Sequence, residues 1–327
     1  MDISVIVPVY GVEKYIDKSL RSLFSQTKTE GVEFILVNDC TKDRSIEIAR
    51  EVIKDFPHCT IRLIEHEVNR GVAAARQTGL DAAIGEYTIH FDPDDWCEPE
   101  MLEELYAKAK EDDADIVGCD YIESYPQKEV YVKQIFPDNG IDCTHKFLQG
   151  EIGGGLWNKL IRQKLFRDND IRLDMGVNHG EDLLFCSRVF PYAKKVSYQK
   201  KAYLHYVQHQ ESLTKSSHLS QNAKLEMLKI VESLEVFYTK HNFIQVLRHS
   251  LIYRKANAKI YLLQGEKSYR YINLFPEINK HINDLVHIKK HWRFALWSTK
   301  SGSLLCFKLI NYMTILKSKL CSKTFLY

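Results

Sequence analysis

Residues 86–98 read EYTIHFDPDDWCE, an apolar run that is followed directly by three acidic residues. The run is rich in aromatic and β-branched side chains, which favour a strand buried between two layers. The carboxylates of Asp92, Asp94 and Asp95 then crowd together, and they repel one another unless a positive group compensates them. Two explanations fit this stretch: a polar turn punctuated by Pro93, or a site for a metal ion.

Strand-like and helical patterns alternate on both sides of this stretch. The strand-like runs are Ile3–Val9, Val32–Asn38, Thr60–Glu65, Glu86–Phe91 and Asp115–Cys119. Apolar residues recur at helical spacing, or helix formers accumulate, over Glu13–Gln26, Arg44–Phe56, Val72–Ala83 and Pro99–Lys110. Because the first two strands are apolar on both faces, the alternation predicts an α/β fold: a mostly parallel, doubly wound sheet with helices on both faces.

The ends of the predicted strands carry polar groups. In doubly wound sheets, ligands bind beyond the carboxyl ends of the strands. Those ends read Pro8-Val9-Tyr10-Gly11, Asn38-Asp39-Cys40 and Asp92-Pro93-Asp94-Asp95. The sequence has no GxGxxG after the first strand and no GxxxxGK[ST], which disfavours dinucleotide and P-loop sites. A D-x-D pair at a strand end instead suits Mg²⁺ or Mn²⁺, which take carboxylate oxygens together with substrate phosphates.

The alternation stops near Ser220, where two long helical patterns begin, Ser220–His241 and Leu247–Leu263. We therefore predict an α/β domain over residues 1–218 and a helical C-terminal region over residues 219–327. That region ends in a basic stretch, because residues 285–327 contain eight Lys or Arg and no Asp or Glu. Such an asymmetry favours contact with an anionic surface.

Composition narrows the class of protein. The whole chain has 45 Lys plus Arg against 43 Asp plus Glu, so no global field indicates a nucleic-acid partner. The eight cysteines are scattered without a CxxC pair, and the N-terminus lacks the basic region of a signal peptide. These features fit a protein of the reducing cytoplasm, and no apolar stretch approaches the roughly 18 residues of a membrane span.

Six blocks of sequence, taken in order, resemble one family. They are VIVPVYGVEKYI (5–16), ILVNDCTKD (35–43), NRGVAAARQTG (69–79), FDPDDW (91–96), WNKL (157–160) and GEDLLF (180–185). From residue 3 to about residue 215 their order and spacing are similar to those of the family 2 glycosyltransferases of the GT-A fold. The resemblance implies transfer of a sugar from a nucleoside-diphosphate donor with inversion at the anomeric carbon. It divides the first domain into a nucleotide-sugar half, 1–98, and an acceptor half, 99–218.

The resemblance implies a donor site along the predicted ligand edge. Asp39 would accept a base N–H, typically from uracil, Asp92 would contact ribose or sugar, and Asp94 would hold the metal. The full set of donor-site residues is Pro8, Val9, Tyr10, Glu13, Asp39, Asn69, Gly71, Arg76, Asp92, Asp94 and Asp95. Plainer roles stay open: Tyr10 and Glu13 as the start of a helix, Asp39 as a turn residue and Arg76 as a solvated charge.

The Glu181-Asp182 pair is the second predicted chemical centre. Direct displacement needs a base that takes the proton of the acceptor hydroxyl, and a carboxylate within hydrogen-bond reach suits this role. The resemblance assigns it to Asp182, with Glu181 orienting Asp182 or holding the acceptor. An N-cap of the following apolar helix is the alternative, and the two roles are compatible.

The resemblance also implies an acceptor side and a closing loop. Trp157 and Lys159 would lie beside the acceptor, with Trp157 either a platform for a sugar ring or an ordinary core residue. Val207 and His209 stand where relatives carry Arg, so His209 becomes a candidate phosphate or metal contact. Gly11 and Asn38 are milder departures from the family pattern.

The tail over residues 304–320, LLCFKLINYMTILKSKL, has an amphipathic pattern. Lys308, Asn311 and Ser318 share one face, and another face carries Leu305, Leu309, Tyr312 and Leu316. This pattern fits a helix in an anionic membrane interface, where a lipid-linked acceptor would be found. Packing onto the domain, or onto a second subunit of a homo-oligomer, is the alternative.

These observations lead to one expected function and two alternatives. We expect an inverting, metal-dependent glycosyltransferase that uses a nucleoside-diphosphate sugar, typically a UDP-sugar. Its acceptor would be a glycan or lipid-linked hydroxyl in cell-surface polysaccharide synthesis, at the inner face of the membrane. A nucleotidyltransferase would also pair such a sheet with metal carboxylates, but it needs a Gly-rich basic loop after the first strand. A catalytically silent nucleotide- or glycan-binding module is the remaining alternative.

Overall fold

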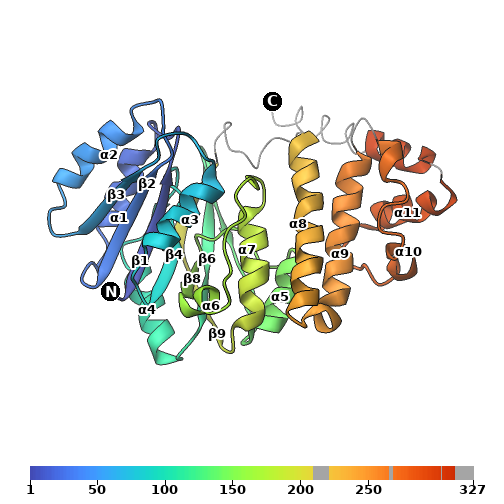
Figure 1. Ribbon diagram of the computed structural model, residues 1–327. Coiled ribbons are helices and arrows are strands. Elements are labelled where there is room, and N and C mark those ends of the chain that lie inside the picture. The colour runs from blue at the N-terminus through green and yellow to red at the C-terminus, as the bar shows by residue number, and fades with distance from the viewer. Residues whose placement is uncertain (209–220, 265–267, 303, 314–327) are drawn as a thin grey trace. The chain divides into compact units, whose positions relative to one another are not determined.

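The computed structural model describes residues 1–208, 221–264, 268–302 and 304–313. The chain forms two compact units, Met1–Ser217 and His218–Tyr327 (Figure 1). The first unit combines a sheet with helices, and every regular element described in the second unit is a helix.

The nine strands described in the first unit form one sheet in the order β3-β2-β1-β4-β8-β6-β9-β5, with β7 paired to β6. Strands β1, β2, β3 and β4 are mutually parallel, as predicted, and they begin and end within one or two residues of the predicted bounds. The strands are β1 Ile3–Val9, β2 Val32–Asn38, β3 Thr60–Glu65, β4 Tyr87–His90, β5 Trp96–Cys97, β6 Ile116–Tyr125, β7 Lys128–Val132, β8 Lys159–Arg162 and β9 Val196–Val207.

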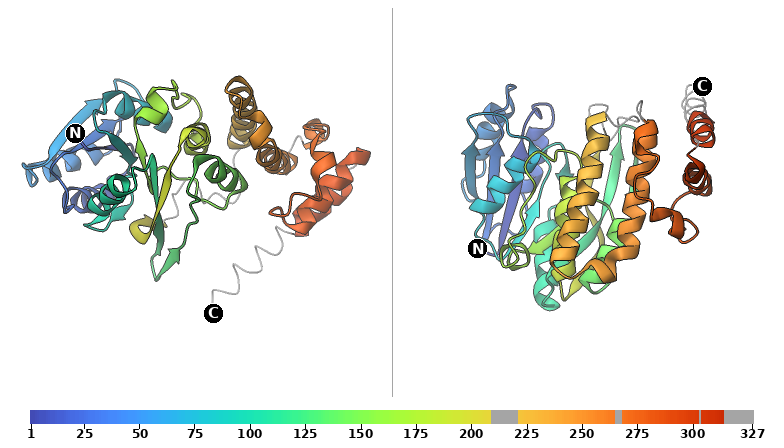
Figure 2. Two further views of the ribbon diagram at one scale, coloured as in Figure 1. Left: turned by 90° about the horizontal axis from the view of Figure 1, so that it is seen from below. Right: turned by 45° about the vertical axis from the view of Figure 1, so that its right-hand side comes forward.

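Alternation along β1 and β2 explains how helices cover both faces of the sheet (Figure 2). Val5 and Phe34 face the larger core cluster, which α1, α2 and α4 close, whereas Ile35 packs against α3. A Cβ atom added at Gly79 of α3 would overlap the side chain of Ile6, so a glycine here lets α3 approach β1 closely. The helices of this unit are α1 Ile16–Phe24, α2 Ser45–Lys54, α3 Val72–Ala82, α4 Met101–Glu111, α5 Gly140–Gln149, α6 Lys164–Arg167 and α7 Glu181–Val189, and a 3-10 turn follows at Phe190–Tyr192.

The second half of the sheet is mixed. Strand β8 runs antiparallel to β4 and β6, and β9 runs parallel to β6 with irregularities near Asp120. Strand β6 also continues beyond the predicted Cys119, as far as Tyr125. The WNKL block therefore lies where β8 begins, so Lys159 is part of a strand inside the sheet.

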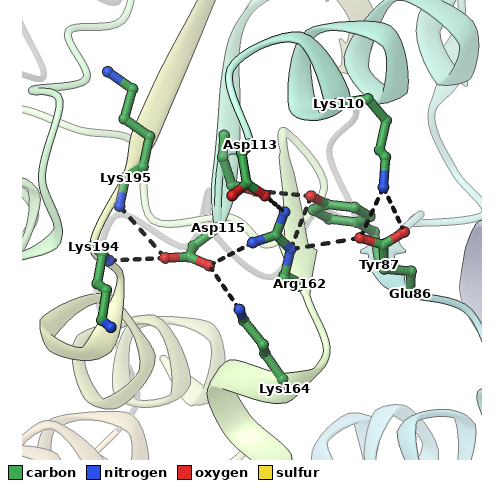
Figure 3. A network of polar contacts seen from close by, with 10 residues as sticks. Glu86, Tyr87, Lys110, Asp113, Asp115, Arg162, Lys164, Lys194 and Lys195 are labelled. Atoms are coloured by element: carbon green, nitrogen blue, oxygen red, sulfur yellow. Dashed lines mark hydrogen bonds and ion pairs between the residues drawn. The ribbon is translucent and has the colours of Figure 1, made fainter.

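A buried arginine network joins β4, β6 and β8 at the edge opposite the predicted ligand edge (Figure 3). The Arg162 guanidinium donates to Tyr87 Oη at 2.9 Å, Asp115 Oδ1 at 3.0 Å and Asp113 Oδ1 at 2.5 Å. Asp115 Oδ2 accepts the Lys194 backbone N–H at 2.9 Å. Each of these polar groups has a partner, as the burial of Arg162 and Asp115 requires.

The second unit has its own core. Buried apolar residues of α9, α10 and α11 meet Phe307 from the helical stretch 305–313. The described helices are α8 Gln221–Lys240, α9 Ile244–Leu263, α10 Ile278–His281 and α11 Lys290–Ser298, with 3-10 turns at Ser268–Tyr271 and Thr299–Ser301. None of the helices in the described ranges has both the length and the apolar character needed to cross a membrane.

Candidate active site

The loops that follow β1 and β2 are tied together by hydrogen bonds. The Glu13 N–H donates to Asp43 Oδ2 at 3.0 Å, and Glu13 Oε2 accepts the Arg44 N–H at 3.0 Å. Asp43 Oδ1 also accepts the Ser45 N–H at 3.1 Å in the first turn of α2. Pro8 and Val9 are buried at the end of β1, while Tyr10 is exposed beside them. The predicted residues Tyr10 and Glu13 thus lie on an ordered loop at the carboxyl edge of the sheet.

Asp39 forms hydrogen bonds with the loop Asn69–Gly71, which the sequence predicts to bind the nucleotide. Its carboxylate accepts the N–H groups of Arg70 at 2.9 Å and Gly71 at 2.8 Å, and its Oδ1 lies 2.7 Å from His66 Nδ1. Asn69 Nδ2 donates to the Asp39 backbone oxygen at 3.3 Å. Because Asp39 is only 2% exposed, these contacts account for its burial.

Gly71 is the N-cap of α3 and has a φ of 86°, a conformation that side chains with a Cβ atom disfavour. A Cβ atom here would also overlap the side chain of Asn178. Gly71 therefore allows the loop Asn69–Gly71 to lie against the segment that leads to Glu181 and Asp182.

Arg76 connects the two predicted chemical centres. This residue is 5% exposed, and its guanidinium donates to Glu181 Oε1 and, at 2.7 Å, to Asp92 Oδ1. Among the described residues its Nε atom has no hydrogen-bond partner. Arg76 is thus a buried ionic link between the D-x-D loop and the start of α7, and it is not the solvated charge that a lone arginine on a helix suggests.

The three aspartates after β4 differ in environment. Asp92 and Asp94 are partly exposed, whereas Asp95 is buried and accepts the Val207 N–H at 2.8 Å through Oδ1. Burial, together with the neighbouring charges of Asp94 and Asp92, raises the pKa of Asp95 well above its usual range. Asp95 therefore anchors the loop to the end of β9, and the two accessible carboxylates are those of Asp92 and Asp94.

These residues fit a hard divalent cation. Two accessible carboxylates lie next to a third whose pKa they raise, and a cation would relieve that crowding. No group of three or more His, Cys, Asp or Glu within the described ranges could hold a metal ion by itself. A site of one or two carboxylates completed by substrate phosphates is compatible with both findings. His209, the other predicted metal contact, lies outside the described residues.

Glu181 and Asp182 occupy the first turn of α7, after Gly180, which has a left-handed φ of 83°. Burial raises the pKa of Asp182, while the positive charges of Arg76 and Lys159 oppose this rise. Burial likewise raises the pKa of Glu181, against the effect of Arg76. Asp182 Oδ1 accepts the Leu183 N–H at 2.6 Å, which fixes the carboxylate at the helix N-terminus. A fixed, partly accessible carboxylate of raised basicity has the properties of a general base.

The predicted acceptor residues Trp157 and Lys159 are buried. Trp157 packs edge-on against Tyr121 at 4.8 Å and stacks on Tyr206 at 5.7 Å between ring centroids. Lys159 Nζ donates to the backbone oxygens of Gly153 at 2.8 Å and Gly155 at 2.5 Å, and to Asn158 Oδ1 at 2.7 Å. In this structure both residues support the glycine loop 153–155 from inside. Tyr121, which lies beside Gly153, and Tyr206, which stacks on Trp157, are partly exposed aromatic residues that the sequence motifs did not indicate as site residues.

The pattern of Glycosyl transferase family 2 matches residues 4–170, half of the chain, and this match includes the β1 loop, the Asn69–Gly71 loop and the D-x-D loop. The chain belongs to this family. The "Putative glycosyltransferase EpsH" of Bacillus subtilis is 31% identical over 269 residues, which cover 75% of this chain and 76% of that relative. The chain is therefore a glycosyltransferase.

Solved structures of similar fold agree with this membership. Residues 1–349 of TarS from S. aureus, in complex with UDP-GlcNAc, superpose with a TM-score of 0.74 at 20% identity, over 97% of this chain and 92% of that chain. The mannosyltransferase PcManGT from Pyrobaculum calidifontis, in complex with GDP-Man and Mn²⁺, gives 0.52 at 14% identity, over 98% and 84% of the two chains. At these identities the likeness establishes the fold, which is GT-A with a helical C-terminal region.

Proposed function

We propose that this family 2 glycosyltransferase transfers a sugar from a UDP-sugar to a hydroxyl group of a cell-surface glycan or lipid-linked acceptor, with inversion. The observation that carries the proposal is the Arg76 link, which joins a D-x-D loop to a buried carboxylate pair. The UDP-GlcNAc bound by the TarS structure supports a UDP donor for this chain. In this proposal residues 1–98 bind the donor, and residues 99–218 bind the acceptor.

The donor site is formed by the loops at the carboxyl edge of the sheet. Tyr10 lies exposed for contact with the nucleotide base, and Asp39 holds the loop of Asn69 and Gly71 in place. Asp94, with Asp92 beside it, would hold Mn²⁺ or Mg²⁺, and the Mn²⁺ in the PcManGT structure supports this choice. When bound, the divalent cation stabilises the departing diphosphate as a Lewis acid.

The proton of the acceptor passes to Asp182. The acceptor oxygen forms a bond to the anomeric carbon, the bond from that carbon to the diphosphate oxygen breaks, and UDP leaves. Arg76 holds Asp92 and Glu181 on the two sides of this reaction, so the D-x-D loop and helix α7 keep a fixed separation. Neutralisation of Glu181 by Arg76 also prevents a second uncompensated negative charge beside Asp182.

We also propose that the enzyme acts in the cytoplasm and contacts the inner face of the membrane through its C-terminal unit. Phe307 faces the core of this unit, but other apolar side chains of α11 and 305–313 are exposed: Phe294 52%, Trp297 54%, Leu309 55%, Tyr312 63% and Met313 68%. Lys300 and Lys308 are exposed as well, without a single Asp or Glu from residue 285 onward. Apolar and basic groups together suit an anionic lipid interface. Residues 314–320 of the predicted amphipathic tail lie outside the described residues.

Release of nucleotide from a panel of UDP- and GDP-sugars, with Mn²⁺, with Mg²⁺ and with EDTA, tests the proposed activity. We expect slow hydrolysis of one UDP-sugar that EDTA abolishes. Turnover that persists in EDTA would refute the metal role, and a GDP-sugar as the preferred donor would refute the UDP assignment. If the protein neither bound nor turned over any donor, that result would favour the catalytically silent module.

A further inference from the structure

The loop Gly153-Gly154-Gly155 lies directly beside the proposed base. Among the described residues, a Cβ atom built on Gly154 would meet one atom within 4.0 Å, Asp182 Oδ2. Because Oδ1 of Asp182 already accepts the Leu183 N–H, Oδ2 is the oxygen that faces the loop. Gly154 is exposed, and Asp182 is partly exposed beside it.

The two neighbouring glycines have different reasons to lack a side chain. A Cβ atom at Gly155 would overlap the indole of Trp157, and one at Gly153 would lie 3.2 Å from Gln134 Oε1 and 3.6 Å from Tyr121 Cε1. Packing inside the protein therefore accounts for Gly153 and Gly155. It does not account for Gly154, where the fold itself has room for a methyl group and the backbone lies outside the left-handed region.

The loop is also held rigidly. Lys159 binds the carbonyl oxygens of Gly153 and Gly155 from inside, and the Gly153 N–H donates to Gln134 Oε1 at 2.7 Å. The Gln134 N–H donates in turn to Asp120 Oδ1 at 2.6 Å. A loop fixed on both sides keeps Gly154 at a constant distance from Asp182, as a binding surface for a reacting hydroxyl requires.

We infer that Gly154 is the floor of the acceptor subsite, and that it lacks a side chain so that a neutral sugar can bring its hydroxyl to Asp182 Oδ2. This inference rests on the proposed function. An acceptor oxygen within about 2.6–3.2 Å of the base carries a carbon that must occupy the space in front of Oδ2. A side chain at position 154 would compete for that space. Tyr121, partly exposed beside Gly153, offers an aromatic edge to the same sugar.

The charges around the loop favour a neutral acceptor over a phosphate-bearing one. Within the described residues that touch the loop or the carboxylate pair, the two cations are Lys159 and Arg76. Lys159 is bound to three oxygens, and Arg76 is paired with Asp92 and Glu181. Neither cation is left to pair with a phosphate group, and the carboxylate of Asp182 would repel one close to the reacting hydroxyl.

A series of substitutions, Gly154→Ala, Gly154→Ser and Gly154→Val, tests this inference in the full-length enzyme. The probes are methyl glycosides of neutral hexoses and N-acetylhexosamines, with ribitol 5-phosphate for comparison, and the donor is the UDP-sugar that the enzyme hydrolyses. We expect the KM for the neutral glycoside to rise with side-chain size, by roughly tenfold or more for valine, as for a misplaced methyl group in a substrate pocket. The donor KM and the thermal midpoint should stay unchanged. Gly155→Ala is the matched control, because it should lower the thermal midpoint by displacing Trp157.

The outcomes separate the inference from the proposed function. An unchanged acceptor KM across the series, with donor hydrolysis intact, would overturn the subsite at Gly154 and leave the proposed function standing. Preferred transfer to ribitol 5-phosphate would overturn the neutral-sugar assignment. A wild-type enzyme that neither binds nor hydrolyses any donor would overturn the proposed function itself.

Discussion

Two buried arginines stand at opposite edges of the same sheet, and they are used differently. Arg162 meets Tyr87, Asp113 and Asp115, and Asp115 is further bound by backbone N–H groups of the Lys194–Lys195 turn. Arg76 meets Asp92 and Glu181, and its Nε lacks a hydrogen-bond partner in the described part of the chain. Each network includes a carboxylate that reaches solvent, Asp113 in the first and Asp92 in the second, and of these two Asp92 lies at the predicted ligand edge.

The electrostatic consequences differ as well. At the Arg162 edge the guanidinium lowers the pKa of Asp113, so the carboxylate there stays charged. At the Arg76 edge burial outweighs the guanidinium, and the pKa values of Glu181 and Asp182 are raised. Carboxylates that are expensive to ionise serve acid–base chemistry, whereas saturated ion pairs join strands. Burial alone therefore does not distinguish the role of Arg76 from that of Arg162. The pKa values of the carboxylates beside them distinguish the two roles.

Substitution of one aspartate at each edge should have the largest effect, on activity at the Arg76 edge and on stability at the Arg162 edge. Asp182→Asn removes the base, and we expect transfer to fall by about 10²–10⁴-fold with the thermal midpoint unchanged. Asp115→Asn is the matched change, and it should lower the free energy of unfolding by roughly 3 kcal/mol while kcat stays near wild type, because it leaves Arg162 under-compensated. Steady-state kinetics and urea denaturation of both variants check this. Equal activity loss in the two variants would remove the distinction.

Removal of the metal should affect the Arg76 edge alone. We expect EDTA, or Asp94→Asn, to lower turnover by more than about a hundredfold, since the lost stabilisation of the diphosphate amounts to several kcal/mol. Donor turnover and thermal denaturation with and without Mn²⁺ provide the measurement. Full activity of Asp94→Asn at saturating Mn²⁺ would exclude Asp94 as the ligand.

Replacement of the arginines themselves sharpens the same contrast. Arg76→Met should lower kcat by roughly 10²-fold, because the D-x-D loop and helix α7 lose the ion pairs that join them. Arg162→Met should lower the free energy of unfolding by about 3–5 kcal/mol and leave the kcat of the folded fraction nearly unchanged. The two variants should be compared at a temperature where both are folded. A large loss of kcat in Arg162→Met would contradict the structural role.

The smallest effect is expected at the C-terminal unit. Trp297→Ser combined with Tyr312→Ser should weaken binding to vesicles that contain anionic phospholipid by about 1–3 kcal/mol, because two exposed rings that would enter the lipid interface are lost. Tyr269→Ser, a change at a residue that is 62% exposed elsewhere in this unit, is the control. Co-sedimentation at constant ionic strength measures the difference. Equal binding by both variants would place membrane contact elsewhere.

The sequence predicted the parallel half of the sheet well, because its strands are continuous apolar runs and its helices carry a clear apolar face. It did not predict β8 or β9. Strand β8 has four residues, and β9 carries Lys200 and Lys201 near its middle, so neither shows a strand period. The mixed half of the sheet is formed by long-range pairing, which short local patterns do not encode.

The candidate site was predictable as a set of residues but not as a geometry. The blocks around Asp92 and Asp182 indicated two chemical centres, and the structure adds that Arg76 links them. Trp157 and Lys159 illustrate the limit, because an aromatic residue or a lysine near a glycine loop has the same sequence signal whether it faces a ligand or the core. Trp157 and Lys159 are buried and Gly154 is exposed because of how β8 packs, and the sequence did not predict β8.

The pH dependence of kcat/KM in wild type, Arg76→Met and Arg162→Met tests the central claim most directly. Asp182 must be deprotonated to act as a base, and burial raises its pKa, so activity should be lost as the pH falls, from a pH above the usual aspartate pKa. Arg76 opposes that rise, so its removal should raise the pKa further and move the acidic limb to higher pH. Arg162→Met should leave the limb where it is. Coincident acidic limbs for all three enzymes would contradict the claim that Arg76 controls the charge of the base.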